Sequence, residues 1–345
     1  MSHTEGTGSD FETVSEASLS REERYRQALD EHVLAPLRIV WSDWRARLAV
    51  FIISIYVLMG TVGVMIVTPP SPNQGPLLMG PFQTLAHPLG TTFSGQDILS
   101  QLVYATPPML KMIAAGAVFT VAVATVIGTV SGYKGGALDS GLMTITDIMM
   151  TIPGLPLIIV LAGVLDLKGD PYVIGVLLSV NAWAGLARAL RSQVLTLRDA
   201  EYVEASRIMG ISTPSILQKD IIPNLMPYIT MNFVQTARGV IFGSVALYFL
   251  GILPYNGVNW GVMMNNANSK AGAVSSPQAF HWLLMPMLAV IVLGLGLTLF
   301  AQAADRLFNP RVRARHAESV AEDDGDGPGE GPEEGGGAQP TGVIQ

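Results

Sequence analysis

The stretch RDAEYVEASRIMGISTPSILQKDIIPNLMP, residues 198–227, is polar and charged, yet it lies between two strongly apolar segments. Asp199 is suited to cap the start of a helix, and Gly210 can adopt the left-handed conformation that ends one. Thr213, which a proline follows, favours the start of a second helix, and Pro223 is expected to end or kink it. The stretch therefore predicts a bent element of two short helices that faces water.

The composition of the whole chain is that of a membrane protein. Its 345 residues are 49% hydrophobic and only 14% charged, and the mean hydropathy is +0.41, which lies on the membrane side of globular proteins. The net charge of -7 comes largely from the two ends of the chain. Because the sequence has no cysteine, disulfides, thiolate metal sites and cysteine nucleophiles are excluded.

Apolar segments recur along the chain at lengths that suit a hydrocarbon core about 30 Å thick. Six are expected to span the membrane: 48–67, 112–130, 142–165, 172–187, 229–251 and 282–304. The fourth is the shortest, and two prolines are expected to kink the third. Because 47 largely polar residues precede the first segment, we do not expect a cleaved signal peptide.

The distribution of basic residues predicts the orientation. With six spans and both ends inside, the outer segments hold only Lys111, Lys168 and Lys270, and every other Lys or Arg except Arg238 falls in an inner segment. Basic residues in short loops are retained on the cytoplasmic side. The stretch 198–227 is therefore expected to face the cytoplasm.

The sequence carries no pattern typical of several catalytic and binding classes. No G-x-x-x-x-G-K-[ST] loop is present, so the chain is not expected to bind ATP itself. The five histidines are scattered without metal-ligand or general-base spacing, and no basic patch indicates nucleic-acid binding. We expect a conduit that binds no cofactor, not an enzyme.

The sequence from Glu204 to Gly210 resembles the signature loop of the membrane subunits of ABC importers, which reads Glu-Ala-Ala, three residues, Gly, then an apolar residue and Pro. Here Ser206 replaces the second Ala, and DIIP ends at Pro223. The stretches WSDWRARLAVF, HPLGTTFSGQDILSQLVYAT, GYKGGALDSGLMTITDIMMTIPGLP and DRLFNPRVR follow the order of the C-type permease in the dipeptide, oligopeptide and nickel branch. This branch commonly has charged residues where Thr92, Gln96 and Gln101 stand, a departure that leaves the substrate open.

The resemblance implies a type I ABC importer permease: all-α, with six transmembrane helices and a cytoplasmic coupling helix that docks on an ATP-binding subunit. The implied partners are a homologous second permease, two ATP-binding subunits that use ATP and Mg, an extracytoplasmic binding protein and membrane lipid. The cargo would be short peptides, or nickel or another small solute. The residues expected at the coupling contact are Glu201, Val203, Glu204, Ala205, Ser206, Arg207, Met209 and Gly210. Val203, Ile208 and Met209 would supply apolar contact, and Glu204 could pair with Arg207 or with the partner.

Polar residues within the expected spans mark a bundle interior or a pathway, because a charged group at that depth costs at least about 2.5 kcal/mol. Arg238 is expected to face the bundle, either in a structural role or on the path, where it could meet a substrate carboxylate; snorkelling is the alternative. Asp147 is expected to pair with a neighbour, and Asn181 to hydrogen-bond between helices. The pairs Gly128–Gly132 and Gly239–Gly243 predict close helix packing, within this chain or against a sister subunit.

We expect three regions: a partly disordered cytoplasmic segment 1–47, a permease domain 48–304 and a disordered acidic tail 305–345. The acidity is typical of a protein in a salt-rich cytosol, as in a halophilic archaeon, and a regulatory tail is the competing interpretation. A multi-pass protein of the cell membrane is expected. The rival is an ion-driven transporter, which predicts inverted repeats and acidic residues in the spans. No clear repeat is present, and Asp147 is the only acidic residue within the expected spans.

Overall fold

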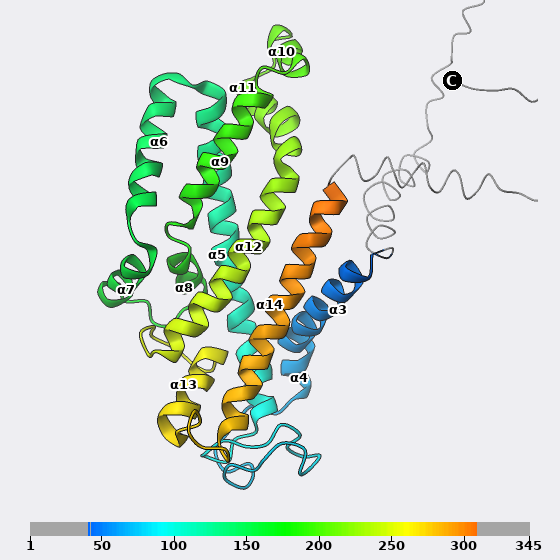
Figure 1. Cartoon of the computed structure of the whole chain (residues 1–345), viewed down its shortest axis with the longest axis vertical. Helices are drawn as coiled ribbons and strands as arrows, with labels where there is room; N and C mark the ends of the chain where they lie inside the picture. Colours follow the sequence, from blue (N-terminus) through cyan, green and yellow to red (C-terminus); the bar gives the residue numbers. More distant parts are fainter. Residues whose placement is uncertain (1–40, 42, 309–345) are drawn as a thin grey trace, which may run out of the picture. The chain divides into compact units, whose positions relative to one another are not determined.

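The computed structural model describes residues 41 and 43–308, and this part of the chain is all-α apart from an isolated β-bridge between Thr91 and Asp97 (Figure 1). The expected terminal tails lie mostly outside the described residues. The elements in chain order are α3 (Trp44–Leu58), the π-helical turn η2 (Met59–Gly63), α4 (Val64–Ile66), α5 (Ile98–Lys134), α6 (Gly136–Thr151), α7 (Gly154–Val164), α8 (Pro171–Leu178), α9 (Ala182–Leu197), α10 (Glu201–Ile208), α11 (Thr213–Ile216), the π-helical turn η3 (Leu217–Ile221), α12 (Ile222–Phe249), α13 (Trp260–Ala271) and α14 (Phe280–Phe308).

Three described helices are long and apolar enough to cross a membrane: Trp44–Ile66, Ile98–Lys134 and Phe280–Ala304. Two bent pairs bring the number to five if each pair is one span. The pair α6 and α7 bends by 88°, and the pair α8 and α9 bends by 56°. The first bend has a local cause, since Pro153 forces the residue before it into an extended conformation, with φ -74° and ψ 122° at Ile152.

The expected fifth span corresponds to α12, which is long enough to cross but is not among the apolar candidates of the described chain. Asn232, Gln235 and Arg238 interrupt its apolar surface. A helix with this composition is suited to a protein interior or an aqueous path more than to lipid. Length and composition therefore support three to five spans, and the sixth rests on the sequence pattern.

The second span begins earlier than the sequence suggested. The prediction placed its start at Met112, whereas α5 begins at Ile98, capped by the Asp97 carboxylate that accepts a hydrogen bond from Ser100 N at 2.8 Å. Pro107 and Pro108 lie inside the helix without ending it. As a result Lys111, expected in an outer segment, lies within α5 with its ammonium 5.9 Å from the Tyr172 ring centroid.

Helix α5 contacts α6, α8, α9, α12 and α13, and glycines allow the closest of these contacts. A Cβ at Gly175 of α8 would lie 2.2 Å from the Met112 carbonyl oxygen, and one at Gly128 would lie 2.6 Å from the Ala187 carbonyl oxygen of α9. Gly132 is equally crowded, because a Cβ there would lie 2.8 Å from the Cβ of Val194. The Gly128–Gly132 pair therefore packs within this chain, which settles one of the two alternatives for it.

The Gly239–Gly243 pair of α12 behaves differently. A Cβ at either glycine would meet nothing within 4 Å, so this face of α12 is open in the isolated chain.

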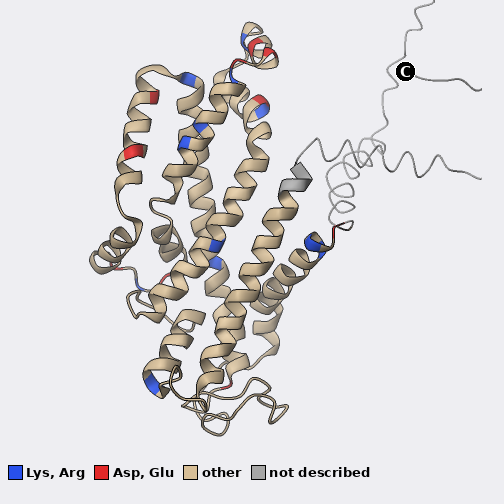
Figure 2. Cartoon of the chain, in the orientation of Figure 1, with Lys and Arg blue, Asp and Glu red and all other residues tan. Residues whose placement is uncertain are grey.

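Two hydrophobic clusters stabilise the helices. One joins α3, α5, α7, α8, α12, α13 and α14, and the other joins the last third of α5 to α9, α10, α11, η3 and the start of α12. Figure 1 shows α10 and α11 at one end of α5, α9 and α12, with α13 at the opposite end. Most of the charged residues gather toward the α10 end (Figure 2). The polar stretch 198–227 thus packs on the second hydrophobic cluster, which is separate from the first.

Candidate functional site

The short helix α10 ends as the sequence predicts but begins differently. Gly210 has φ +74°, and the amides of Gly210 and Ile211 donate to the carbonyls of Arg207 and Ser206 at 3.0 and 3.1 Å. These two bonds form a Schellman motif, which satisfies carbonyls at a helix end. The prediction that Asp199 caps the start is wrong, because Ala200 holds the cap position and makes no side-chain cap bond.

The side chains of α10 divide into an anchored and an open set. Val203 is fully buried and Ser206 is 7% exposed, whereas Ile208 is 80% and Met209 is 70% exposed. The remaining predicted contact residues are exposed as well: Glu201, Glu204, Ala205, Arg207 and Gly210. This corrects the expectation that Val203 offers an apolar contact to a partner, since it packs into the chain's own core. The buried position of Ser206 explains why a small residue suffices where the signature has Ala.

The predicted pairing of Glu204 with Arg207 is absent from the described ion pairs. Arg207 instead turns toward the body of the protein, where its Nη2 donates to the Arg198 carbonyl at 3.3 Å and its guanidinium carbon lies 5.7 Å from the Tyr133 ring centroid. Its interaction with the Tyr133 side chain raises the pKa of Arg207, so the guanidinium stays charged. Glu204 is thereby left open to a partner.

The second half of the element is continuous with the next long helix. Pro223 does not end the helix that starts at Thr213: α11, η3 and α12 follow one another without a break, and Pro223 lies in the first turn of α12. The π-helical turn η3 directly precedes the proline, with Ile222 N donating to the Leu217 carbonyl, and this local change in the hydrogen-bond pattern accommodates the proline without ending the helix. Asn224 Nδ2 donates to the Asp220 carbonyl at 2.7 Å and to the Tyr202 hydroxyl at 3.3 Å, which connects α12 to α10. A side-chain hydrogen bond thus joins α12 directly to α10.

Behind α10 lies a cavity of about 400 Å³ with a basic lining. Lys134, Arg198 and Arg207 contribute three cations against the single carboxylate of Asp199. Arg198 Nη1 donates to the Gly132 carbonyl at 3.3 Å, and its Nε lies 3.5 Å from Asp199 Oδ1. The side of α10 that faces the protein is therefore lined by basic residues, whereas its exposed side carries Glu201 and Glu204.

Two ion pairs tie α6 to α9 at the same end of the protein. Asp147 pairs with Arg188, and Asp139 accepts two hydrogen bonds from the Arg191 guanidinium. The expected partner of Asp147 is thereby identified. Asp139 was not predicted as a site residue from the sequence. The available signal was the matched charge of two neighbouring helices, with two acidic residues on α6 and two basic residues on α9.

Asn181 lies where both bent pairs break. It holds the cap position of α9, and its Nδ2 is 3.5 Å from the Ile152 carbonyl, at the break between α6 and α7. A Cβ at Gly154 would lie 2.9 Å from the same nitrogen. The expected hydrogen bond of Asn181 between helices therefore connects the break between α8 and α9 to the break between α6 and α7.

Arg238 lies between α12 and α14, where its Nη1 donates to Thr298 Oγ1 at 3.3 Å. It lines a cavity of about 200 Å³ together with Gln235, Gln302 and apolar residues. No carboxylate among the described side chains forms an ion pair with it.

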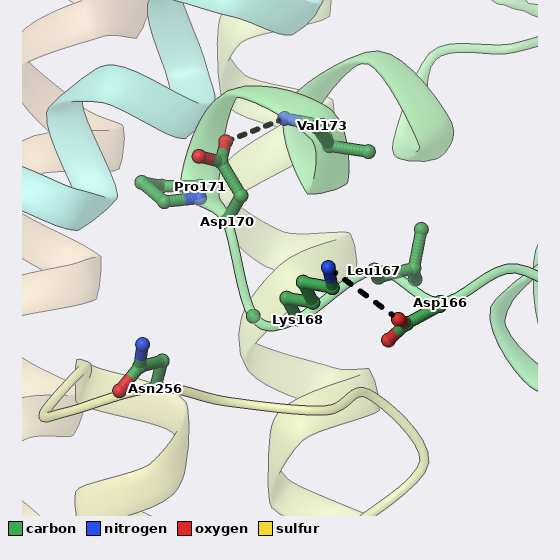
Figure 3. Close-up of a pocket in the computed structure, with 8 residues that line it drawn as sticks. Asp166, Leu167, Lys168, Asp170, Pro171, Val173 and Asn256 are labelled. Atoms are coloured by element: carbon green, nitrogen blue, oxygen red, sulfur yellow. Dashed lines mark hydrogen bonds and ion pairs between the residues drawn. The ribbon is translucent and has the colours of Figure 1, made fainter.

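At the end away from α10, the loop before α8 forms a cavity of about 480 Å³. Figure 3 shows Lys168 turned toward Asp166, and the Nζ–Oδ2 distance is 3.8 Å. The Asp170 carboxylate caps α8 by accepting from Tyr172 N and Val173 N at 2.8 and 3.1 Å. A Cβ at Gly169 would lie 2.4 Å from Asn256 N, so two loops meet closely here. The sequence pattern gave this cluster no role.

Residues 124–314 match the family of binding-protein-dependent transport system inner membrane components. The chain belongs to this family. The match includes the stretch 198–227, both ion pairs between α6 and α9, and Arg238 with its neighbours. The protein is therefore a non-catalytic, multi-pass subunit of a transport system in the cytoplasmic membrane.

Curated relatives of this inner membrane component are peptide permeases. The dipeptide transport system permease DppC of Bacillus subtilis (strain 168) is 35% identical over 183 residues, which are 52% of this chain and 56% of the relative. The oligopeptide permease OppC of the same strain is 33% identical over 181 residues, 52% of this chain and 59% of the relative. OppC of Lactococcus lactis subsp. cremoris (strain SK11) is 29% identical over 211 residues, 61% of this chain and 70% of the relative. The first two alignments thus span less than two thirds of those relatives.

Among solved structures, a chain of the MetNI methionine ABC transporter in an inward-facing conformation aligns with a TM-score of 0.44 and 18% identity. The alignment covers 60% of this inner membrane component and 96% of that chain.

Proposed function

We propose that this inner membrane component is the permease subunit of an ATP-driven importer and forms half of a path for short peptides. The observation that carries the proposal is the division of α10: Val203 and Ser206 anchor it, while Glu204, Ala205 and Ile208 stay open. An exposed apolar and acidic face on a helix anchored from behind is suited to a protein partner that must move it.

The partners follow from this proposal. Two ATP-binding subunits dock at the coupling helices, a homologous permease completes the path, and an extracytoplasmic binding protein delivers the cargo. ATP and Mg are used by the ATP-binding subunits, and this chain binds no cofactor. In this arrangement α12 is the fifth of six spans, and its polar residues face the path and not lipid. Short peptides are favoured as cargo because the curated relatives are named as dipeptide and oligopeptide permeases.

Coupling in this arrangement depends on differential contacts. Closure of the ATP-binding subunits moves α10, and the continuous run from α11 to α12 carries the movement into the membrane. Energetic coupling requires that the docked surface contacts the partner differently in the two states, and not merely adhesion.

The test is purification of a tagged chain in mild detergent, with identification of the copurifying proteins and an ATPase assay. Ile208→Asp places a charge at the centre of the open face without touching the core. We expect at least tenfold lower recovery of the ATP-binding subunits, a loss of about 1.4 kcal/mol of binding free energy. Leu85→Asp is the matched control, because Leu85 is also an exposed aliphatic residue, at 100%, but lies in the segment between α4 and α5. Recovery of the chain alone, without ATPase activity, would contradict the proposal.

A further inference from the structure

Arg238 is a charged side chain at membrane depth whose counter-charge is not in the described part of the chain. Its depth follows from contacts between α14 and the first span. A Cβ at Gly296 would lie 2.6 Å from Ile52 Cγ2, and Arg45 Nη1 donates to Gln302 Oε1 at 3.4 Å. Thr298, which accepts from Arg238, lies between these two contacts along α14. Thr298 and the guanidinium of Arg238 therefore lie level with the first turn of the apolar segment 48–67.

The neighbours of the guanidinium are neutral groups that hydrogen-bond. Gln235 is three residues before Arg238 and Gln302 is four after Thr298, so both share the cavity-facing side of their helices. Thr298 donates its own hydroxyl proton to the Gly294 carbonyl at 2.8 Å, which leaves its oxygen as the acceptor for Arg238. A single neutral acceptor leaves most of the guanidinium N–H donors available to a ligand.

The site also has space beside the arginine. The cavity measures about 200 Å³, and the neighbouring Gly239 is open, since a Cβ added there would meet nothing within 4 Å. An arginine fork surrounded by neutral donors is suited to a planar carboxylate, which it binds through two parallel hydrogen bonds.

We infer that Arg238, with Gln235, Thr298 and Gln302, forms a binding site for the C-terminal carboxylate of the transported peptide. This inference rests on the proposed function. A peptide carboxylate is favoured over a lipid phosphate because, in the proposed arrangement, the polar residues of α12 face the path and not lipid. Its competitor is a carboxylate of the sister permease, which two experiments distinguish.

The first experiment tests the site without using a substrate. The chain has no cysteine, so Gln235→Cys gives it a single thiol beside the arginine. In the purified complex, the rates of modification by an anionic methanethiosulfonate (sulfonatoethyl) and a cationic one (trimethylammonioethyl) are compared on this chain. We expect the anionic-to-cationic ratio to fall about tenfold when Arg238→Gln is added. Lys270→Gln removes one positive charge from α13 and is the matched control, with an unchanged ratio. A ratio that does not respond to Arg238→Gln, or a thiol that neither reagent reaches, would overturn the inference.

The second experiment uses proteoliposomes of the complete transporter with its binding protein, and compares uptake of trialanine and trialanine amide. Arg238→Gln is expected to lower trialanine uptake at least tenfold, to leave uptake of the amide unchanged, and to be partly rescued by Arg238→Lys. Equal trialanine uptake by wild type and variant would overturn the carboxylate site. Loss of the sister permease from the Arg238→Gln complex would do so too, by assigning the arginine to a subunit contact. If the wild type takes up neither peptide, the proposed peptide function fails, while the thiol experiment still decides the site.

Discussion

At the scale of single residues, the proposed coupling helix α10 depends on one backbone conformation and two buried side chains. Gly210 alone lets the chain reverse after α10, because its φ of +74° is unfavourable for residues with a Cβ. Val203 and Ser206 hold the helix down, and Glu204 is exposed without an ion pair among the described residues. Position in the helix, more than residue type, separates the anchors from the contacts.

Gly210→Ala should loosen the end of α10 without any clash, since a Cβ added there would have nothing within 4 Å. The left-handed conformation costs an L-residue roughly 1–2 kcal/mol. Hydrogen exchange at the amides of residues 210 and 211, which donate in the Schellman motif, should accelerate about 5- to 30-fold. Gly141→Ala in α6 is the control, because it also has open space but an ordinary helical φ, and it should leave exchange at residue 211 unchanged. Equal protection in the Gly210→Ala variant would show that the motif does not hold this end.

At the scale of elements, glycine contacts and ion pairs join the bent helices to α5 and to each other. The backbones of α5 and α8 meet at Gly116 and Gly175. A Cβ added at Gly116 would lie 2.6 Å from the Gly175 carbonyl oxygen, and one added at Gly175 would lie 2.2 Å from the Met112 carbonyl oxygen. A short helix such as α8, which has only eight residues, contributes little stability by itself. Close packing on α5 therefore determines where α8 lies.

Gly175→Ala should destabilise this packing, because the added methyl meets backbone atoms that cannot move aside. Overpacking of this kind costs about 1–3 kcal/mol. The measurement is the unfolding temperature of the purified chain in detergent, followed by size-exclusion chromatography after heating. Gly185→Ala in α9 has nothing within 4 Å and should be neutral or slightly stabilising. A Gly175→Ala chain as stable as that control would mean that α5 and α8 are not in direct contact.

The Asp139–Arg191 pair should couple α6 to α9. Exchanging the two charges in one chain, as Asp139→Arg with Arg191→Asp, should recover part of the stability that either single substitution loses. The interaction free energy from the double-mutant cycle is expected at about 0.5–3 kcal/mol, from thermal unfolding of the four chains. Strictly additive effects would show that the pair is not formed.

At the scale of the whole molecule, the sequence predicts much of the architecture for identifiable physical reasons. The Gly210 and Pro153 signals predict the turn after α10 and the break in the third span, because both features depend on local chemistry. The start of α5 at Ile98 is not predicted, since it depends on the cap that Asp97 forms. The continuity of the helix past Pro223 is not predicted either, since it depends on the π-helical turn η3. The partner of Asp147 and the neighbours of Arg238 are not predicted either, because they lie far away in the sequence and meet only in the folded chain.

The same distinction holds for the coupling surface. The signature residues are contiguous in sequence, so the motif indicates the element but not which side chains are open. Burial of Val203 beside exposed Glu204 becomes visible only when α10 is seated on the second hydrophobic cluster. The open face of α12 at Gly239 and Gly243 is likewise a property of the packed helices.

The most direct measurement of the central claim is site-specific crosslinking from α10 in the assembled complex. Because the chain has no cysteine, Ala205→Cys and Ser206→Cys each introduce a single thiol, one exposed and one 7% exposed. After labelling with a photoreactive maleimide, we expect irradiation to join residue 205 to an ATP-binding subunit and to give little product from residue 206. Crosslinks from residue 205 only to the sister permease, or none in a complex that hydrolyses ATP, would contradict the assignment of α10 as the coupling helix.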